Sequence, residues 1–487
     1  MNAQIVRLYV FVLVLFAGLI YFTSRWAVLE ADELKANRGN NRPLIEEQQI
    51  KRGTITSSDG VLIAESLPEG GGPQRVYVRR YPEGALFGNP VGYSFVEVER
   101  SGVELAENEL LTGEKNEFAS LIDELLNETQ VGNDVTLTLD AAAQRVATGA
   151  LQTAVANSGA KGGSVVAIEP DTGAVKVMAS VPGFDPNAVK SPSTFSELSE
   201  QGTSSGLFFG ATQATYPPGS TMKVVTAAAA LDSGEFDPTT TLSGASPQTV
   251  SGAPLSNSGN QSFGTIDMTT ALTNSVNTYW AQVGERLGTG TYMDYMERFG
   301  FNSDPQLNYP DEQMAPSGVY ESGSLLGRSD LIDVGRVAIG QERLLATPLQ
   351  MTQVASAVAN GGELMKPTLL QGATDPDGRE VEELDPDVQS DVMSAETAAQ
   401  VTEMMTQVAS IGTAASLSTS LGELAGKTGT AELNIEQRLN QPWFIGFAPA
   451  GDPQIAIAAT LEPCTGCFGA DDAGPVATQV MDALAGG

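Results

Sequence analysis

Ser220 and Lys223 stand three positions apart in the stretch "YPPGSTMKVVTAAAALDSG", where a Pro-Pro-Gly turn leads into an Ala-rich run. At the start of a helix, residues with this spacing project from one face, so the amine can reach the hydroxyl. A serine hydroxyl is a poor nucleophile until a base removes its proton. The chain has no histidine, which excludes Ser-His-Asp catalysis. Lys223, held neutral by burial or by a second cation, is therefore the candidate base.

The alternative interpretation of this pair is a serine that caps a helix beside a solvated lysine. An S-x-x-K spacing arises about once or twice by chance in a chain of this length, and Ser158 with Lys161 is a second copy. A further motif, Ser275-Val276-Asn277, opens another predicted helix and supports the catalytic interpretation. The other S-x-N copy, at residues 258–260, lies in a Ser/Asn/Gly-rich loop.

A third motif, Lys427-Thr428-Gly429-Thr430, is the only K-T-G in the chain and lies on a predicted core strand. A lysine on a buried strand is costly unless it faces a cleft. We expect Gly429 to let a ligand backbone approach closely. The order S-x-x-K, S-x-N, K-T-G within one domain is far more specific than any of the three motifs alone.

The segments that carry these motifs predict an α+β fold. Two β-rich runs flank a Pro-Asp-Thr-Gly turn in residues 162–186, mostly helical segments follow, and three strands and a last helix end the chain. The simplest assembly is a five-stranded antiparallel sheet with helices on both faces. Short alternating strands from residue 51 onward predict a β-rich N-terminal domain. We place the boundaries at residues 1–29, 30–158 and 159–487, with a charged stalk over residues 30–45 and a short helix over residues 118–127.

With these motifs, and with "GSVVAIEPDTGAVKVMASVPGFDPN", "NSVNTYW" and "KTGTAE" followed by "WFIGFAP", the chain resembles the penicillin-binding transpeptidases and the serine β-lactamases. It looks like a monofunctional class B penicillin-binding protein, most like the actinobacterial penicillin-binding protein A group. "RGTITSSDGVLIAES" resembles the N-terminal signature of this class, although Ser57 and Ser58 stand where Asp-Arg is usual, which puts a salt bridge in doubt. Glu342 stands where glycine is commoner. No segment between the N-terminus and the transpeptidase part looks like a glycosyltransferase, which excludes the bifunctional class.

The resemblance implies a peptidoglycan D,D-transpeptidase that cross-links stem peptides through a serine acyl-enzyme, releases D-alanine and is inhibited by β-lactams. It also implies the roles of the first two motifs. Ser220 attacks the penultimate D-alanine, and Lys223 accepts its proton. Ser275 relays a proton to the departing D-alanine, and Asn277 holds Lys223 and the substrate amide.

The K-T-G motif completes the site by the same resemblance. Lys427 binds the terminal carboxylate and helps to keep Lys223 neutral, and the hydroxyls of Thr428 and Thr430 contact the same carboxylate beside Gly429. The backbone N–H groups of Ser220 and Thr430 form the oxyanion hole. The resemblance implies no cofactor and no metal.

Two other functions share this fold. A hydrolase, either a D,D-carboxypeptidase or a β-lactamase, would release the acyl group to water. The deacylating glutamate of one β-lactamase class lies in an E-x-x-L-N segment between S-x-N and K-T-G, and none stands there. The similar "ENEL" at residues 107–110 precedes Ser220, and we expect it to be a surface turn. A non-catalytic cell-wall scaffold or β-lactam sensor would be identified by its failure to be acylated.

The N-terminus predicts a membrane anchor. Residues 8–22 contain no charged or strongly polar residue, and residues 26–29 extend the apolar character toward the ~20 residues that span a bilayer. Arg7 precedes the span and Glu30, Asp32 and Glu33 follow it, which favours a cytoplasmic N-terminus and an extracellular catalytic domain. A cleaved signal peptide is the alternative, but no A-x-A-like site follows. By resemblance, the partner in the membrane is a polytopic lipid-II glycosyltransferase.

Charge and cysteine content exclude other classes. The net charge is −33, with 59 acidic and 26 basic residues, so a phosphate backbone would be repelled and nucleic acid is not an expected partner. The two cysteines, Cys464 and Cys467, are too few to hold zinc without other soft ligands. We expect a small structural disulfide between them, with free thiols as the alternative.

Overall fold

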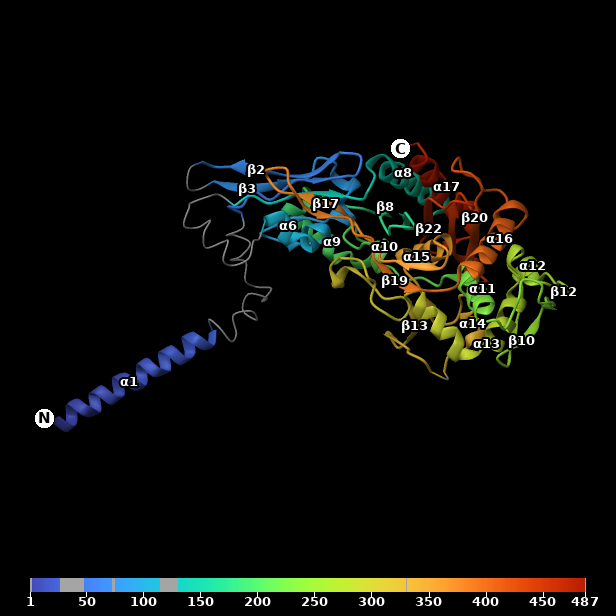
Figure 1. Ribbon diagram of the computed structural model, residues 1–487, viewed down its shortest axis with the longest axis horizontal. Helices are drawn as coiled ribbons and strands as arrows, with labels where there is room; N and C mark the ends of the chain where they lie inside the picture. The colour runs from blue at the N-terminus through green and yellow to red at the C-terminus, as the bar shows by residue number, and fades with distance from the viewer. Residues whose placement is uncertain (1, 27–47, 72–74, 114–129, 330, 487) are drawn as a thin grey trace.

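The computed structural model describes residues 2–26, 48–71, 75–113, 130–329 and 331–486. The stalk expected over residues 30–45 and the helix expected over residues 118–127 lie outside these ranges. The predicted apolar span forms helix α1 (Asn2–Ser24) (Figure 1). Within the described residues it is the one helix that is long and apolar enough to cross a membrane, and none of its apolar window is buried in the protein.

The larger part of the chain is built on an antiparallel sheet in the order β20-β21-β22-β7-β8. Its strands come from the two ends of this part, as predicted. They are β7 (Gly163–Ile168), β8 (Val175–Val181), β20 (Ala425–Asn434), β21 (Leu439–Ala448) and β22 (Ile455–Leu461). Every residue of β7 and β22 is buried, because helices cover both faces of the sheet. The five-stranded prediction is confirmed, with the short β23 (Cys464–Thr465) added beside β21.

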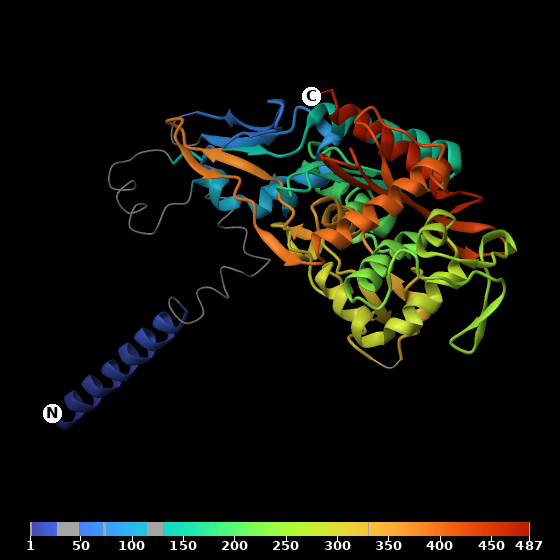
Figure 2. The same cartoon turned by 45° about the vertical axis from the view of Figure 1, so that its right-hand side comes forward.

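One face of this sheet is covered by two helices that lie side by side in both views (Figures 1 and 2), α8 (Ala141–Ser158) and α17 (Gly474–Leu484). The other face carries α15 (Pro348–Ala359), with α11 (Lys223–Asp232), α13 (Asn277–Arg298) and α16 (Ala395–Ile411) around it. The shorter helices are α4 (Gly88–Val91), α5 (Gly102–Ala106), α6 (Asn108–Thr112), α9 (Pro192–Glu200), α10 (Gly210–Gln213), α12 (Met268–Thr273) and α14 (Val334–Val337).

The N-terminal part has its own sheet, in the order β18-β17-β6-β1-β2-β3. Four strands come from its own sequence, β1 (Ile55–Thr56), β2 (Leu62–Glu69), β3 (Val76–Arg80) and β6 (Asp134–Leu137). The other two, β17 (Leu370–Thr374) and β18 (Glu380–Glu383), return from the catalytic part, and Figure 1 shows β17 in orange beside the blue strands. Helix α8, in turn, packs on the catalytic sheet. The N-terminal sheet thus contains strands from beyond residue 158, and the catalytic sheet packs against a helix that precedes residue 159.

Two details of the N-terminal part bear on the sequence analysis. Where the family signature has Asp-Arg, the Ser57 hydroxyl donates to Asp59 at 2.5 Å, and the Asp59 carboxylate accepts from the backbone N–H of Ala141 at the start of α8. The signature is thus tied to α8 without the usual ion pair. The surface turn expected at residues 107–110 is wrong, because Glu107 is buried and Asn108 begins helix α6.

Candidate active site

Ser220 lies in a tight 3-10 turn, Gly219–Met222, that leads directly into α11. Gly219 has a φ of +55°, and Gly340, which packs against it, has a φ of +74°. A Cβ on Gly340 would lie 1.9 Å from the Gly219 carbonyl oxygen, so only glycine fits there. The two glycines let a neighbouring loop press the turn into place, and Ser220 stands at a helix start where N–H groups have no intrahelical acceptor.

Lys223 is fully buried, and four oxygen atoms surround its Nζ. The Ser220 Oγ lies at 2.9 Å, the Ser275 carbonyl oxygen at 2.8 Å, the Ser275 Oγ at 3.2 Å and the Asn277 Oδ1 at 2.6 Å. A neutral amine has two protons and one lone pair. It can donate to the carbonyl of Ser275 and to Asn277 while its lone pair accepts the Ser220 hydroxyl, which is the arrangement that a general base requires.

The S-x-N motif lies in the short connection between α12 and α13, and α13 begins at Asn277 rather than at Ser275. Ser275 has a φ of +55°, in the left-handed region that residues with a Cβ rarely adopt. This conformation presents both its carbonyl oxygen and its hydroxyl to Lys223. The Asn277 amide is fixed from the other side, since its Nδ2 donates to the Ser256 carbonyl at 3.1 Å.

Lys427 on β20 is also fully buried. Its Nζ donates to the Ser275 Oγ at 3.0 Å and to the Thr428 carbonyl oxygen at 2.8 Å. Burial lowers the pKa of Lys427 to about 7. Burial, together with the charge of Lys427, holds the pKa of Lys223 well below its usual range. The hydroxyl of Ser275 therefore lies between two lysines whose pKa values are both lowered.

The K-T-G strand forms one wall of the site, and its glycine makes a close contact within the protein. A Cβ on Gly429 would lie 2.8 Å from the Pro218 carbonyl oxygen and 3.0 Å from the Thr221 methyl group. The missing side chain thus lets β20 approach the turn that carries Ser220. The hydroxyl of Thr430 accepts from the backbone N–H of Gly469 at 3.2 Å.

Sequence reasoning missed Thr413, which follows α16 and exchanges a hydrogen bond of 2.7 Å with the Thr428 hydroxyl. A lone threonine in a loop belongs to no motif, so no signal marked it. Both hydroxyls line the cleft. Of two hydroxyls joined by a hydrogen bond, one donates its proton to the other, and the second hydroxyl can then direct its own proton outward, toward an anion.

These groups open into a cleft of about 700 Å³. The residues that line it are Gly219, Ser220, Ser256, Asn257, Ser258, Gly259, Asn260, Gln261, Asn274, Ser275, Asn277, Ile339, Gln341, Thr413, Thr428, Thr430, Glu432, Ile435, Phe468, Gly469 and Ala470. The loop at residues 258–260, whose S-x-N spacing we set aside, is thus a wall of the cleft, although no bond joins it to Lys223. The second S-x-x-K copy is elsewhere, since Ser158 ends α8. Over the described residues, no cluster of three or more metal-ligating side chains occurs.

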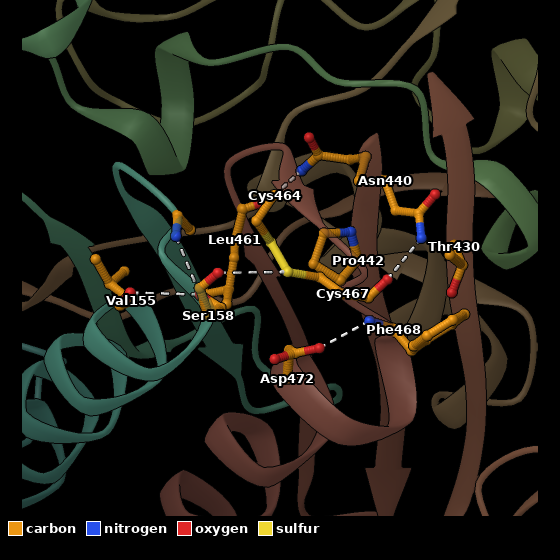
Figure 3. The surroundings of a disulfide bond; sticks show 12 residues. Val155, Ser158, Thr430, Asn440, Pro442, Leu461, Cys464, Cys467, Phe468 and Asp472 are labelled. Atoms are coloured by element: carbon orange, nitrogen blue, oxygen red, sulfur yellow. Dashed lines mark hydrogen bonds between the residues drawn. A yellow bond between two sulfur atoms is a disulfide. The ribbon is translucent and has the colours of Figure 1, made fainter. Parts of the chain in front are cut away.

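A disulfide joins Cys464 and Cys467 in the turn that follows β22 (Figure 3). The Cys467 carbonyl oxygen accepts from the Asn440 side chain at 3.0 Å, and the Phe468 N–H donates to Asp472 at 2.7 Å. Phe468 and Gly469 follow at once and line the cleft. The disulfide therefore fixes the start of one cleft wall.

Comparisons with known proteins agree with this architecture. The family model of the penicillin binding protein transpeptidase domain matches residues 163–482, and the chain belongs to that family. A second model, the penicillin binding protein A dimerisation domain, matches residues 52–135.

Individual relatives are similar to this chain over most of its length. The chain is 32% identical to the peptidoglycan D,D-transpeptidase PbpA of Mycolicibacterium smegmatis, over 95% of this chain and 94% of that protein. The imipenem acyl-enzyme complex of penicillin-binding protein A from M. tuberculosis is 29% identical with a TM-score of 0.78, over 90% of this chain and 99% of that one. The D,D-transpeptidase domain of a peptidoglycan glycosyltransferase from Eggerthella lenta is 30% identical with a TM-score of 0.75, over 90% of this chain and 98% of that one.

Proposed function

We propose that this chain is a peptidoglycan D,D-transpeptidase that acts through a serine acyl-enzyme. The observation that carries the proposal is the 2.9 Å contact between Ser220 and a buried lysine with a lowered pKa, at the base of an open cleft. The whole-length similarity to named D,D-transpeptidases, and the acyl-enzyme complexes of its structural relatives, support the same reaction.

In the acylation step, the neutral Lys223 amine accepts the Ser220 proton while Oγ attacks the carbonyl of the penultimate D-alanine. The oxygen that becomes negative is stabilised by the N–H groups of Ser220 and Thr430. Ser220 supplies a free N–H because it stands in the first turn of a helix, and Thr430 lies on the edge strand β20. The C–N bond to the terminal D-alanine then breaks, and its nitrogen takes the proton from Lys223 through the Ser275 hydroxyl.

The terminal carboxylate fits the Thr428 and Thr413 hydroxyls, since both line the cleft. Lys427 does not line it, so its charge acts on the carboxylate from behind Ser275 and Thr428. Direct contact between Lys427 and the carboxylate stays a prediction. In the second step, an amine of another stem attacks the ester and the C–N bond of the cross-link forms. The C–O bond to Ser220 breaks, and Lys223 passes a proton from the attacking amine to the Ser220 oxygen.

A hydrolase remains the second candidate, and the site offers one observation against it. Among the described residues that line the cleft, Glu432 is the only one with a carboxylate, and it is exposed on β20 beyond Thr430. A deacylating base must hold a water beside the ester, and we propose that no residue of this cleft does so. Slow deacylation in water would follow.

The protein would act outside the cell. Helix α1 is suited to a single-pass anchor, and Arg7 before its apolar core favours a cytoplasmic N-terminus. The catalytic part would then face the peptidoglycan. A polytopic lipid-II glycosyltransferase in the same membrane would supply the strands to be cross-linked.

The test is the intact mass of the region from about residue 48 to residue 487, before and after benzylpenicillin, with Ser220→Ala beside it. We expect one stable penicilloyl adduct that is absent from the variant. An adduct that disappears within seconds would indicate a hydrolase. No adduct in a folded protein would overturn the assignment of Ser220 and leave a scaffold.

A further inference from the structure

Asn257 lies in the loop at residues 256–261, which carries the second copy of the S-x-N spacing, and it is only 5% exposed. Its Nδ2 donates to the carbonyl oxygens of Gly244 at 3.0 Å and Gln261 at 2.9 Å, and its Oδ1 accepts from the backbone N–H of Thr278 at 2.9 Å. The amide has one satisfied orientation, because the reverse one would bring its oxygen against two carbonyl oxygens. One side chain thus joins both sides of this loop to the first turn of α13.

The contact with α13 meets a need of that helix. The first N–H groups of a helix have no intrahelical acceptor. Val276, the N-cap residue of α13, has no side-chain oxygen to offer them. The Asn257 Oδ1 supplies the acceptor for Thr278 from 21 residues earlier in the chain. The loop and the start of the helix are therefore held in one relative position.

The residue next to Asn257 orients the Asn277 amide. The Ser256 carbonyl oxygen accepts from the Asn277 Nδ2 at 3.1 Å, which leaves the Asn277 Oδ1 directed at the Lys223 Nζ at 2.6 Å. If this amide turned over, its oxygen would face the Ser256 oxygen, and its Nδ2 would donate to the lone pair of the Lys223 amine. That lone pair must accept the Ser220 proton. The Ser256 carbonyl therefore keeps the lone pair available.

We propose that Asn257 is a positioning residue for the acylation of Ser220, because it holds the Ser256 carbonyl where that carbonyl orients the Asn277 amide. The inference rests on the proposed function, since it requires Lys223 to be the base. Among the hydrogen bonds of the described residues, none joins Asn257 to Lys223, so Asn257 acts through Asn277. An asparagine that only stabilised the loop would not change how the amine binds its proton.

The test is the second-order rate constant for acylation by benzylpenicillin, measured by intact mass across pH. Without Asn257, the Asn277 amide loses its fixed orientation. The protonated Lys223 then loses an oxygen acceptor, which lowers its pKa, and the neutral amine shares its lone pair with Nδ2. Asn257→Ala should therefore slow acylation about tenfold or more, and the rising limb of the pH profile should move to lower pH. Lys427, whose charge also lowers the pKa of Lys223, is unchanged in this variant.

The same substitution in an Asn277→Ala protein shows whether the effect passes through Asn277. There we expect the loss caused by Asn257→Ala to shrink to less than about twofold, since the amide to be positioned is gone. The matched control is Asn360→Ala, which removes another asparagine that donates to a backbone carbonyl, that of Glu363 at 3.2 Å, outside the cleft lining. It should leave the rate and the profile unchanged.

Urea denaturation checks that each variant is folded. If Asn257→Ala does not fold, Ser246→Ala replaces it, because the Ser246 hydroxyl accepts from the Asn257 N–H at 3.0 Å. This milder variant should move the limb in the same direction by a smaller amount, and an unchanged profile would then overturn the inference.

Three results with a folded Asn257→Ala protein would each overturn the inference. These are a wild-type rate, a rising limb that stays in place, and a loss that multiplies in full with the loss caused by Asn277→Ala. In all three cases benzylpenicillin still acylates the wild-type protein, so the proposed function survives. If the wild-type protein is not acylated at all, the proposed function itself fails.

Discussion

Replacing Lys427 with methionine tests how far the charge of Lys427 lowers the pKa of Lys223. Both Nζ atoms contact the Ser275 Oγ, at 3.2 Å and 3.0 Å, so they lie at most 6.2 Å apart. Two unit charges at that distance repel each other by about 2.7 kcal/mol at an effective dielectric constant near 20, and by about 0.7 kcal/mol at the value for water. These energies correspond to about two and about half a pKa unit. Lys427→Met should therefore raise the pKa of Lys223 by an amount in this range.

The assay is the second-order rate constant for acylation by benzylpenicillin between pH 5 and pH 10. Acylation requires the neutral Lys223, so the rising limb of the profile should move to higher pH by about half to two units. The shift should be largest near and below pH 7, where Lys427 keeps its proton. Lys161→Met, which removes an exposed lysine of the second S-x-x-K copy, should leave the profile in place.

An unchanged profile in a folded Lys427→Met protein, with only a uniform loss of rate, would refute this reasoning. Lys427 would then act only by positioning Ser275 or the substrate, and burial alone would keep Lys223 neutral. A shift to lower pH would contradict the sign of the interaction.

Four further outcomes follow from the same geometry. The unfolded chain binds a proton on Lys427 up to about pH 10.4, whereas the folded chain releases it near pH 7. The free energy of unfolding should therefore rise by up to ~1.4 kcal/mol per pH unit between these two values. Urea titrations of Lys427→Met should lack this contribution. Ser275→Gly should raise the free energy of unfolding in urea by ~1 kcal/mol, because the φ of +55° at this position suits glycine, yet it should lose acylation activity. Equal stability of Ser275→Ala and Ser275→Gly would show that the backbone at Ser275 is not strained. Gly429→Ala should cost ~1–3 kcal/mol and slow acylation, since its Cβ would push β20 away from the Pro218 carbonyl, and an unaffected rate would show that the strand has room to move. Changing Cys464 and Cys467 together to serine should lower stability by about 2 kcal/mol, as expected for a short closed loop, and thermal denaturation under reducing conditions should give wild type the same loss.

The parts of the fold that the sequence predicts are those set by short-range patterns. The hairpin at residues 162–186 has a turn signature between two apolar runs, and it forms the antiparallel pair β7 and β8, with one register shift between Ala167 and Ile168. Ser220 and Lys223 are three residues apart, so their contact follows from helical spacing once a helix begins there. The three strands near the C-terminus are long and apolar enough to be recognised, and they pair as expected.

The parts that sequence reasoning missed depend on contacts between distant segments. Strands β17 and β18 are short and polar, and what holds β17 is pairing with β6, far away in the sequence. Thr413 lies in the cleft only because the end of α16 meets β20. Close approach of a ligand to Gly429 stays a prediction, and the structure adds a close approach of the Ser220 turn to Gly429, which no local pattern reveals.

The residues at the centre of the site share a property that separates them from the rest of the core. Lys223 and Lys427 are buried where a hydrophobic residue would be cheaper, and Ser275 has a backbone conformation that costs about 1 kcal/mol or more. Each cost brings a specific contact, since the strained Ser275 is, within the described residues, the only group that touches both amines. A fold optimised for stability alone would replace all three residues. Their presence together is best explained by proton transfer from Ser220 to Lys223, whose pKa is lowered by burial and by the charge of Lys427.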